Sequence, residues 1–392
     1  MTVWDDVVGQ QNVVQTLQRA AEAARRIVTD HPSTPDQAMS QAWLLTGPPG
    51  SGRSTAARSF AAALECTGET PGCGECSGCT TVLAGTHPDV EHLETHGVTI
   101  TIAQARDLVK HTYEAPIVGH WRVLIVEDAD RMADHTANVL LKAIEEPPER
   151  TVWVLAAPSP ADVISTIRSR CRILHLVTPS VDDVAHLLQK RDGIDAHTAQ
   201  LAAQISQAHI GRARGLAMDE AAREERSELI SAVVSLHTMG DVEVLAQSVA
   251  AKAKEAATKH AEDDAEQQKS TLVHTLGVDE SSRLPSQVRG QMRDIDAEYK
   301  RRNTRLVRDA VDRAMVDVLS VYRDVLLVGF GAHVALINQD FADDIRRLAA
   351  TIPPEDAADR METISRARVR LSHNVTPLLA LEAMFASLRI VQ

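Results

Sequence analysis

The sequence has few aromatic residues: phenylalanine, tryptophan and tyrosine together make up 3% of its 392 residues. Alanine, leucine and valine are abundant instead, a composition that favours helices over a β-sandwich. Apolar runs of about 18 residues are also missing, so we expect no membrane-spanning helix. The first residues lack the charged-then-apolar pattern of a secretory signal, and we therefore expect a cytoplasmic protein.

A surplus of positive charge is absent as well. Lysine and arginine number 41 against 54 aspartate and glutamate residues, which gives a formal net charge of −13. Because a DNA-binding surface needs basic side chains to neutralise phosphates, this chain is not expected to grip DNA broadly by itself. The scarce aromatic residues also weaken an interpretation as a zinc-bearing nucleic-acid module, which would stack bases on such rings.

Strand and helix patterns alternate over the first 178 residues. Five short apolar runs are predicted to be strands, at residues 42–46, 90–93, 121–126, 151–156 and 171–176. Helical periodicity lies between them, notably at residues 53–64, 102–111 and 134–146. Such alternation predicts a parallel sheet covered by helices on both faces.

The strand pattern stops after Pro179. Residues 179–218 are predicted to form a small domain of short helices, and residues 219–392 a larger, entirely helical domain. Residues 252–269 are rich in charge and have no strong apolar face, so we expect a solvated helix or partial disorder there. With a predicted loop at 275–285, the segment 252–300 forms a charged excursion to which we assign no function.

The Gly-rich loop after the first strand lacks the lysine of a phosphate-binding loop. Residues 47–54 read Gly-Pro-Pro-Gly-Ser-Gly-Arg-Ser, with Arg53 in place of that lysine. Such a loop points backbone N–H groups at a phosphate, so we expect Gly47, Gly50 and Gly52 to shape it and Ser54 to offer a hydroxyl to Mg²⁺. A guanidinium is longer and planar, and we therefore expect ATP or ADP to bind, if at all, without hydrolysis.

Two strand ends also depart from an ATP-hydrolysing pattern. One strand is followed by Glu127-Asp128 instead of Asp-Glu, which changes the reach of each carboxylate by about 1.5 Å in a reaction sensitive to about 1 Å. An acidic strand end that merely faces solvent is the alternative. The strand at 151–156 is followed by Ala157-Pro158, where such ATPases place a polar sensor.

Four cysteines are clustered at Cys66, Cys73, Cys76 and Cys79. Cysteines remain reduced in the cytoplasm, so they are predicted to hold a structural Zn²⁺ through four thiolates. An iron–sulfur cluster or unliganded thiols are the alternatives. The fifth cysteine, Cys171, is expected to be a small buried residue.

Ser169, Arg170 and Cys171 lie between a short predicted helix and a strand. An arginine displayed there can reach a phosphate held by a neighbouring subunit and stabilise transition-state charge in trans. The spacing alone favours the simpler alternative, a surface arginine at a helix C-terminus.

Together these features resemble the bacterial clamp-loader family of AAA+ proteins, most closely its delta-prime branch. The resemblance covers nearly the whole chain and rests on several motifs. They are Val8-Gly9-Gln10, the cysteines with residues 85–89, the run 138–148, Ser169-Arg170-Cys171, residues 211–214 and residues 374–382.

The resemblance implies an α/β plus all-α architecture of three domains. These are a RecA-like AAA+ domain (1–178, with a zinc module at 66–79), a helical lid (179–218) and a helical collar (219–392). It implies that Arg170 is an arginine finger flanked by Ser169 and Cys171, and that Arg214 is a second sensor beside the altered nucleotide site.

The resemblance also implies partners in replication. They are gamma/tau ATPase subunits and a delta subunit in a five-membered ring, with the sliding clamp and primed DNA reached through the complex at a nucleoid-associated replisome. A subunit that does not hydrolyse ATP is favoured by three departures from the family pattern: the altered loop, Glu127-Asp128 and Ala157. An active gamma/tau-like motor subunit is the alternative.

Overall fold

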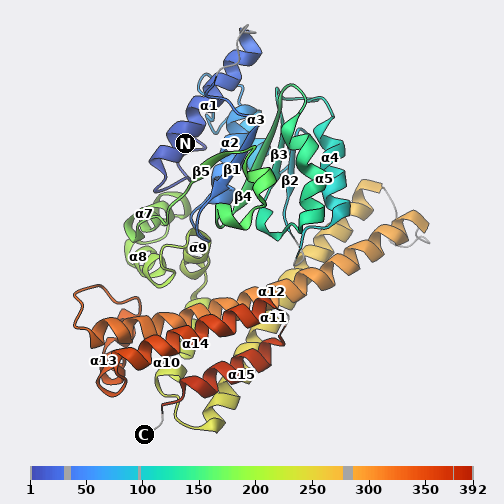
Figure 1. The fold of residues 1–392 in the computed structure, drawn as a ribbon. Helices are drawn as coiled ribbons and strands as arrows, with labels where there is room; N and C mark the ends of the chain where they lie inside the picture. Colours follow the sequence, from blue (N-terminus) through green and yellow to red (C-terminus); the bar gives the residue numbers. More distant parts are fainter. Residues whose placement is uncertain (1, 31–36, 96–98, 277–285, 374, 391–392) are drawn as a thin grey trace. The chain divides into compact units, whose positions relative to one another are not determined.

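The computed structural model describes residues 2–30, 37–95, 99–276, 286–373 and 375–390. The chain divides into two compact units, Met1–Met218 and Asp219–Gln392 (Figure 1). The first unit holds both the predicted sheet domain and the predicted lid. The three-part division therefore stays a prediction.

Five parallel strands form the sheet of the first unit, in the order β2-β3-β4-β1-β5. They are β1 (Ala42–Thr46), β2 (Val90–Leu93), β3 (Arg122–Val126), β4 (Thr151–Ala157) and β5 (Arg172–His175). Every residue of β1, β3 and β4 is buried, as expected for central strands of a parallel sheet. The predicted fold class is confirmed, and the carboxyl ends of all strands meet at one edge.

Helices cover both faces of this sheet (Figure 1). Trp43 and Leu45 of β1 pack in one core cluster with α1 (Gln11–Thr29) and α2 (Arg53–Leu64). Leu44 lies on the opposite face, in a cluster with α4 (Ile102–Thr112) and α5 (Asp134–Glu145). Alternate strand residues point to opposite faces, so a continuous apolar run fills two cores.

Short helices complete the first unit. The predicted lid consists of α7 (Val181–Asp192), α8 (Ala196–Ile205) and α9 (Ile210–Met218). Near the sheet lie α6 (Ser165–Arg168) and two 3₁₀ turns, η1 (Ala129–Arg131) and η2 (Pro160–Asp162). A helix not predicted from the sequence, α3 (Ser77–Leu83), begins within the cysteine module, where glycine and threonine concealed the helical pattern.

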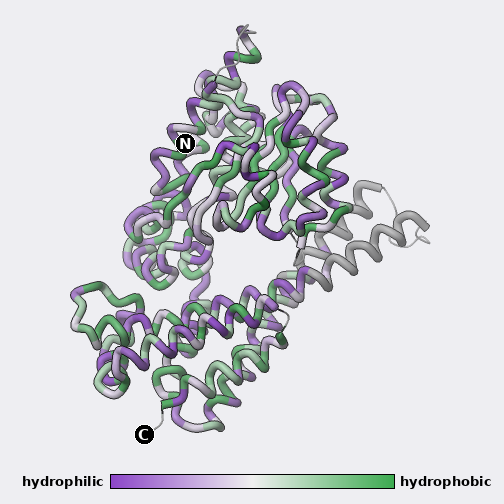
Figure 2. The backbone as a smooth tube through the Cα atoms, viewed as in Figure 1, coloured by the Kyte–Doolittle hydropathy of each residue, from purple (hydrophilic) through white to green (hydrophobic). Residues whose placement is uncertain are grey.

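The second unit is helical, and hydrophobic and hydrophilic residues alternate along its helices (Figure 2). Its elements are α10 (Glu220–Val234), α11 (Met239–Leu276), α12 (Ser286–Gly329), η3 (Gln339–Phe341), α13 (Ala342–Thr351), α14 (Pro354–Ser372) and α15 (Pro377–Leu388). A non-helical stretch after α12 departs from the all-helical expectation. The buried Asp324 carboxylate fixes it by accepting the backbone N–H groups of Ile337 and Asn338 at 3.1 and 2.8 Å.

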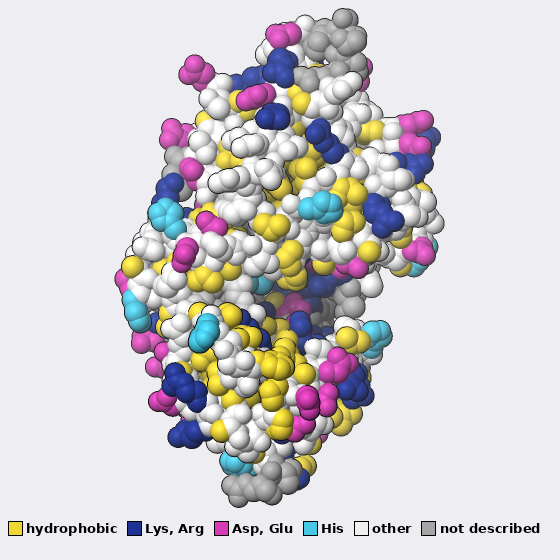
Figure 3. Space-filling view, turned by 60° about the vertical axis from the view of Figure 1, so that its left-hand side comes forward, with side chains coloured by type: hydrophobic (Ala, Val, Ile, Leu, Met, Phe, Trp, Pro, Cys, Tyr) yellow, Lys and Arg dark blue, Asp and Glu magenta, His cyan; other side chains and the backbone are white. Residues whose placement is uncertain are grey.

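The charged excursion is helical as far as the structure describes it. Helix α11 continues to Leu276 and α12 begins at Ser286, so the described part of this segment agrees with the helical alternative. The predicted loop at 275–285 falls outside the described residues from 277 onward. Among the described helices none is long and apolar enough to cross a membrane. Acidic and basic side chains are interspersed over the face drawn in Figure 3.

Candidate functional site

The Gly-rich loop joins the carboxyl end of β1 to the start of α2, as predicted. The Gly47 backbone N–H donates to the carbonyls of Ala157 and Pro158 at 3.3 and 3.2 Å, which anchors the loop to the end of β4. Gly50 and Gly52 have φ angles of 83° and 90°, a conformation that glycine adopts without strain. The loop therefore has the backbone shape of a phosphate cradle at the edge of the sheet where parallel strands end.

The side chain of Arg53 bends back onto this loop. Its Nη1 donates a hydrogen bond of 2.6 Å to the carbonyl oxygen of Gly47. Burial lowers the pKa of Arg53, whereas the nearby carboxylates of Asp128, Asp130 and Glu127 act to raise it. The cation at the lysine position is thus engaged with the loop's own backbone and with an acidic cluster.

Ser54 and Glu127 are brought together from α2 and the end of β3. The Ser54 side chain hydrogen-bonds the Glu127 carboxylate, which also lies 2.9 Å from Nε2 of His92. Burial would raise the pKa of Glu127, but the hydrogen bonds from His92 and Ser54 and the charges of His92 and Arg58 lower it. A hydroxyl and a carboxylate in contact can share a divalent cation.

Asp128 is turned toward its own 3₁₀ turn. It has a φ of 55°, in the left-handed region, which aspartate tolerates better than most residues. Its carbonyl accepts the Arg131 N–H at 2.8 Å, and its carboxylate lies 3.5 Å from Nε of Arg131. Burial raises the pKa of the neighbouring Asp130, whose buried Oδ1 has no hydrogen-bond partner.

Ala157 ends β4 beside the loop. It is fully buried, and its carbonyl accepts the Gly47 N–H. A methyl side chain offers no polar atom to a phosphate. ATP-hydrolysing relatives of this fold were expected to have a polar sensor at this position. Here the position is occupied by a buried core residue.

The small helices meet the loop at the start of α9. Ile210 donates its N–H to the Gly50 carbonyl at 3.4 Å, and a Cβ on Gly50 would lie 2.4 Å from the His209 ring. Arg214, farther along α9, pairs with Asp192 of α7, with 3.0 Å between Nε and Oδ1. This contact joins two lid helices, and the sensor role of Arg214 stays a prediction.

Gln10 fastens the loop to the segment after β5. Its side-chain amide donates to the carbonyls of Ser51 and Val177 at 3.2 and 2.6 Å, and its Oε1 accepts the Val177 N–H at 3.0 Å. The motif Val8-Gly9-Gln10 therefore has a structural role here: it links the N-terminal lead-in to the phosphate loop.

Arg170 lies in the turn between α6 and β5, with a third of its side chain exposed. Its guanidinium donates to the Thr166 carbonyl at 2.9 Å and to Glu145 Oε1 at 3.0 Å. The adjacent Ser169 hydroxyl also bonds the Thr166 carbonyl. Because Glu145 is half exposed, this ion pair is weak, about 0–1 kcal/mol, and can be exchanged for another anion.

Cys171 follows Arg170 and packs against the core cluster of the α4–α5 face. Burial raises the pKa of its thiol to about 12. The thiol is thus protonated and only partly buried, whereas a small buried residue was expected.

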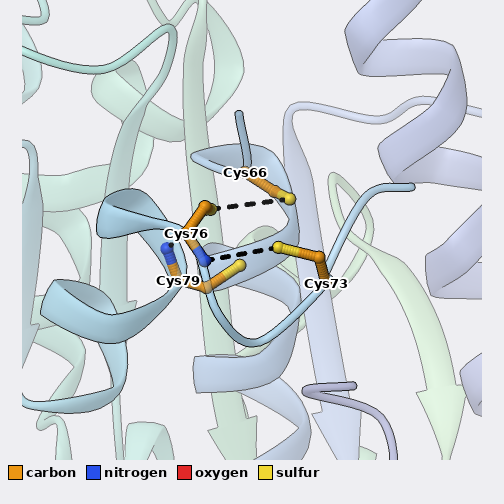
Figure 4. Close-up of side chains that lie close together, drawn as sticks. All are labelled: Cys66, Cys73, Cys76 and Cys79. Carbon is orange, nitrogen blue, oxygen red and sulfur yellow. Dashed lines mark hydrogen bonds between the residues drawn. The ribbon is translucent and has the colours of Figure 1, made fainter. Parts of the chain in front are cut away.

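The four clustered cysteines converge in space (Figure 4). Their sulfur atoms all lie within 4.8 Å of one another, and those of Cys66 and Cys76 are 3.8 Å apart. Four sulfurs bound to a tetrahedral zinc at about 2.3 Å lie about 3.8 Å from each other. The cluster therefore has the donor set and the dimensions of a structural zinc site, with every coordination position supplied by the protein.

Backbone N–H groups donate hydrogen bonds to two of these sulfur atoms, as they would to metal-bound thiolates. Cys76 donates its N–H to the sulfur of Cys73, and Cys79 donates to that of Cys76, each at 3.4 Å. Burial alone would raise the pKa of Cys76, but hydrogen bonds from Cys79 and Thr67 lower it to about 5. Burial raises the pKa of Cys79, so a metal would have to displace its proton.

Close packing and hydrogen bonds hold the cysteine module to the rest of the first unit. A Cβ on Gly78 would lie 2.0 Å from the Glu65 carbonyl oxygen, so only glycine fits between α2 and α3. Arg25 of α1 donates to the carbonyls of Glu69, Gly68 and Cys66 at 2.5, 2.8 and 3.1 Å. These contacts hold the loop that carries Cys66 and Cys73.

Two buried carboxylates, whose roles were not predicted from the sequence, hold the loop before β3. Asp89 accepts the backbone N–H groups of Ile117, Val118 and Gly119 at 2.6, 2.8 and 2.7 Å. Glu65 accepts those of the next two residues at 2.9 and 3.2 Å. The loop thus displays Ile117 and Val118, which are 76% and 72% exposed. His92 was missed too, because a histidine in a short strand gives no pattern of its own.

The family match lies within the first unit of the chain. The family model described as DNA polymerase III, delta subunit, matches residues 28–180. A DNA polymerase III delta′ subunit of Pseudomonas aeruginosa is 40% identical over 134 residues, covering 33% of this chain and 41% of that protein. A delta′ subunit of Bacillus subtilis is 30% identical over 200 residues, covering 51% and 60% respectively.

A tau-type relative extends over more of the chain. The DNA polymerase III subunit tau of Salmonella typhimurium is 27% identical over 383 residues, covering 93% of this chain and 50% of that protein. The chain thus spans between two fifths and three fifths of the length of these three curated relatives. Both delta′ and tau subunits are among the proteins that it resembles.

Proposed function

We propose that this chain, a member of the bacterial clamp-loader family of DNA polymerase III, acts as a delta-prime-like subunit. In this role it helps to load the sliding clamp onto primed DNA without hydrolysing ATP itself. Its partners would be gamma/tau-type ATPase subunits and a delta subunit in a five-membered ring, and it would reach clamp and DNA through that complex.

The hydrogen bond between Arg53 and Gly47 is the observation that carries this proposal. In hydrolytic loops the lysine ammonium reaches the β- and γ-phosphates. Here the cation turns away to the loop's own carbonyl, Asp128 faces Arg131, and a buried alanine ends β4. From these three departures we infer that hydrolysis is lost, whereas the loop backbone that can hold a nucleotide is retained.

Arg170 is proposed to act on a neighbouring subunit's ATP. Its charge is displayed in the turn before β5, and its resting partner Glu145 is exposed and easily exchanged. A guanidinium brought to a γ-phosphate stabilises the charge that develops during phosphoryl transfer. Ser169 and Cys171 would position it through the Thr166 hydrogen bond and core packing.

The cysteine cluster is proposed to hold a structural Zn²⁺ through Cys66, Cys73, Cys76 and Cys79. The distances and donor chemistry fit this ion. When bound, zinc would cross-link α2, α3 and the intervening loop. Since all four positions are filled by thiolates, these residues have a structural role.

The test is DNA-stimulated ATP hydrolysis by a loader reconstituted with Arg170→Ala. We expect a loss of about 10³-fold or more, the scale typical of such fingers, with unchanged assembly and thermal unfolding. The neighbouring Arg168→Ala is the matched control and should keep most of the activity. Full activity with Arg170→Ala would refute the finger.

An active gamma/tau-like motor is the second candidate. The similarity to tau over 93% of the chain and the contact between Ser54 and Glu127 favour it. The isolated chain distinguishes the two: steady ATP turnover that Arg53→Ala abolishes would support the motor, and no turnover above background supports the delta-prime-like role.

A further inference from the structure

A cluster of one histidine and two glutamates lies at the carboxyl edge of the sheet, away from the cysteines in sequence. His92 belongs to β2, Glu94 follows that strand, and Glu127 follows the adjacent β3. The parallel register pairs His92 with Ile125 and Leu93 with Val126, so both strands end at the same level. One potential ligand atom from each of the three residues lies within 4.8 Å of the others.

We propose that His92 and Glu127, supported by Glu94, form a second metal site that takes a divalent first-row transition metal without nucleotide. The site is separate from the cysteine cluster, and it shares Glu127 with the altered nucleotide site. Its imidazole distinguishes it from the hydroxyl and carboxylate donors that bind Mg²⁺ alongside a nucleotide.

His92 and Glu127 lie close enough to bind one ion. Nε2 of His92 and Oε1 of Glu127 are 2.9 Å apart. Two ligands about 2.0–2.1 Å from a tetrahedral zinc lie about 3.3 Å from each other. The two atoms would therefore move apart by about 0.4 Å to accept the ion in place of their hydrogen bond.

Glu94 is placed on the other side of the imidazole. Its Oε1 lies 3.7 Å from Nδ1 of His92. Metal-bound histidines usually donate their second ring N–H to a carboxylate, which fixes the tautomer and strengthens the ligand. A carboxylate at each ring nitrogen is therefore the arrangement of a metal-binding histidine with its outer partner.

The surroundings of His92 and Glu127 set the choice of metal. The side chains of His92 and Glu127 are 22% and 20% exposed, so an ion can enter and keep water ligands. Ser54 bonds Glu127, and the charges of Arg53 and Arg58 act on that carboxylate. These cations oppose a second positive ion, and imidazole favours zinc, cobalt or nickel over magnesium.

The experiment counts zinc bound to the full chain, without nucleotide, by equilibrium dialysis and elemental analysis. The wild type should bind a second zinc ion per chain beyond that in the cysteine cluster. His92→Gln should lose this second ion and retain the first. Glu94→Gln should weaken the second ion by about 10- to 100-fold, as expected for an outer partner. Excess Mg²⁺ should not displace it.

Glu91→Gln is the matched control, since it removes a carboxylate from the neighbouring position of the same strand. It should bind both ions as the wild type does. Co²⁺ substitution adds a readout that does not depend on counting. The second ion should show cobalt absorption without thiolate charge transfer, and that absorption should vanish in His92→Gln.

A wild type that binds only the cysteine-held ion would overturn the proposal. So would a second ion that survives both His92→Gln and Glu94→Gln, because it would then reside on other surface histidines. Either outcome leaves the ATPase test of Arg170 unaffected, so failure of this site and failure of the clamp-loader role are distinguishable.

Discussion

The guanidinium of Arg53 donates a hydrogen bond of 2.6 Å to the carbonyl oxygen of Gly47, six residues earlier in the same loop. The contact joins the two ends of the loop. It uses the cation that occupies the position of the phosphate-binding lysine. Lysine is not equivalent at this position, because the guanidinium is a planar fork of donors whereas an ammonium is a compact point charge.

Arg53→Lys should therefore restore nucleotide affinity. We expect ATP to bind the variant at least about tenfold more tightly than the wild type, equivalent to about 1.4 kcal/mol. Hydrolysis should remain absent, because the carboxylate order and Ala157 are unchanged. A fluorescent-nucleotide titration measures this, with Arg58→Lys on the same helix as the control. Equal affinities of Arg53→Lys and wild type would contradict the role given to the contact.

Glu145→Gln should release Arg170 from its resting ion pair. The pair is exposed on both sides, so the stability of the isolated chain should change by less than about 1 kcal/mol. ATPase activity of the reconstituted loader should be retained or increased, in contrast to Arg170→Ala. A loss as large as that of Arg170→Ala would mean that Glu145 positions the arginine for its target.

Removal of zinc should destabilise the first unit. If free zinc exceeds its Kd about 100-fold, chelation costs about 2.7 kcal/mol of stability. Thermal unfolding of the full chain with and without a chelator measures this, and Cys76→Ser should reproduce the effect. Cys171→Ser is the matched control, because it removes the cysteine outside the cluster. Identical unfolding with and without chelator would argue against a structural metal.

Asp89→Asn should destabilise the chain by about 3 kcal/mol, since it weakens three charge-assisted hydrogen bonds from Ile117, Val118 and Gly119. Burial would raise the pKa of Asp89, but these hydrogen bonds and the charge of His87 hold it below its usual value. Its contribution is therefore fully present above the unfolded pKa near 3.9 and is lost as pH falls through the lower folded pKa.

Denaturant unfolding between about pH 3 and pH 7 should show the difference between wild type and Asp89→Asn constant above about pH 5. It should shrink only in the acidic range. A difference that grows on acidification would show that the charged form of Asp89 is not the one that holds the loop.

Much of the architecture could be predicted from local sequence. The runs at 42–46 and 151–156 are apolar enough to be central strands, and Gly52 before Arg53 marks a helix start. Periodicity failed within the cysteine module, where α3 begins directly after Cys76. It failed again after α12, where the buried Asp324 stabilises backbone that is not helical. In both places contacts outside the segment decide its conformation.

The sequence by itself determined the residue types available for chemistry: four cysteines at short spacing, a Gly-rich loop without its lysine, and an arginine between a short helix and a strand. Those types follow from composition and spacing alone. Tertiary structure decided which of them meet. It turned Arg53 onto Gly47, paired Arg214 with Asp192 and brought His92 to Glu127 across two strands. Such pairings depend on how separate elements pack, and the spacing of residues in the sequence does not show that geometry.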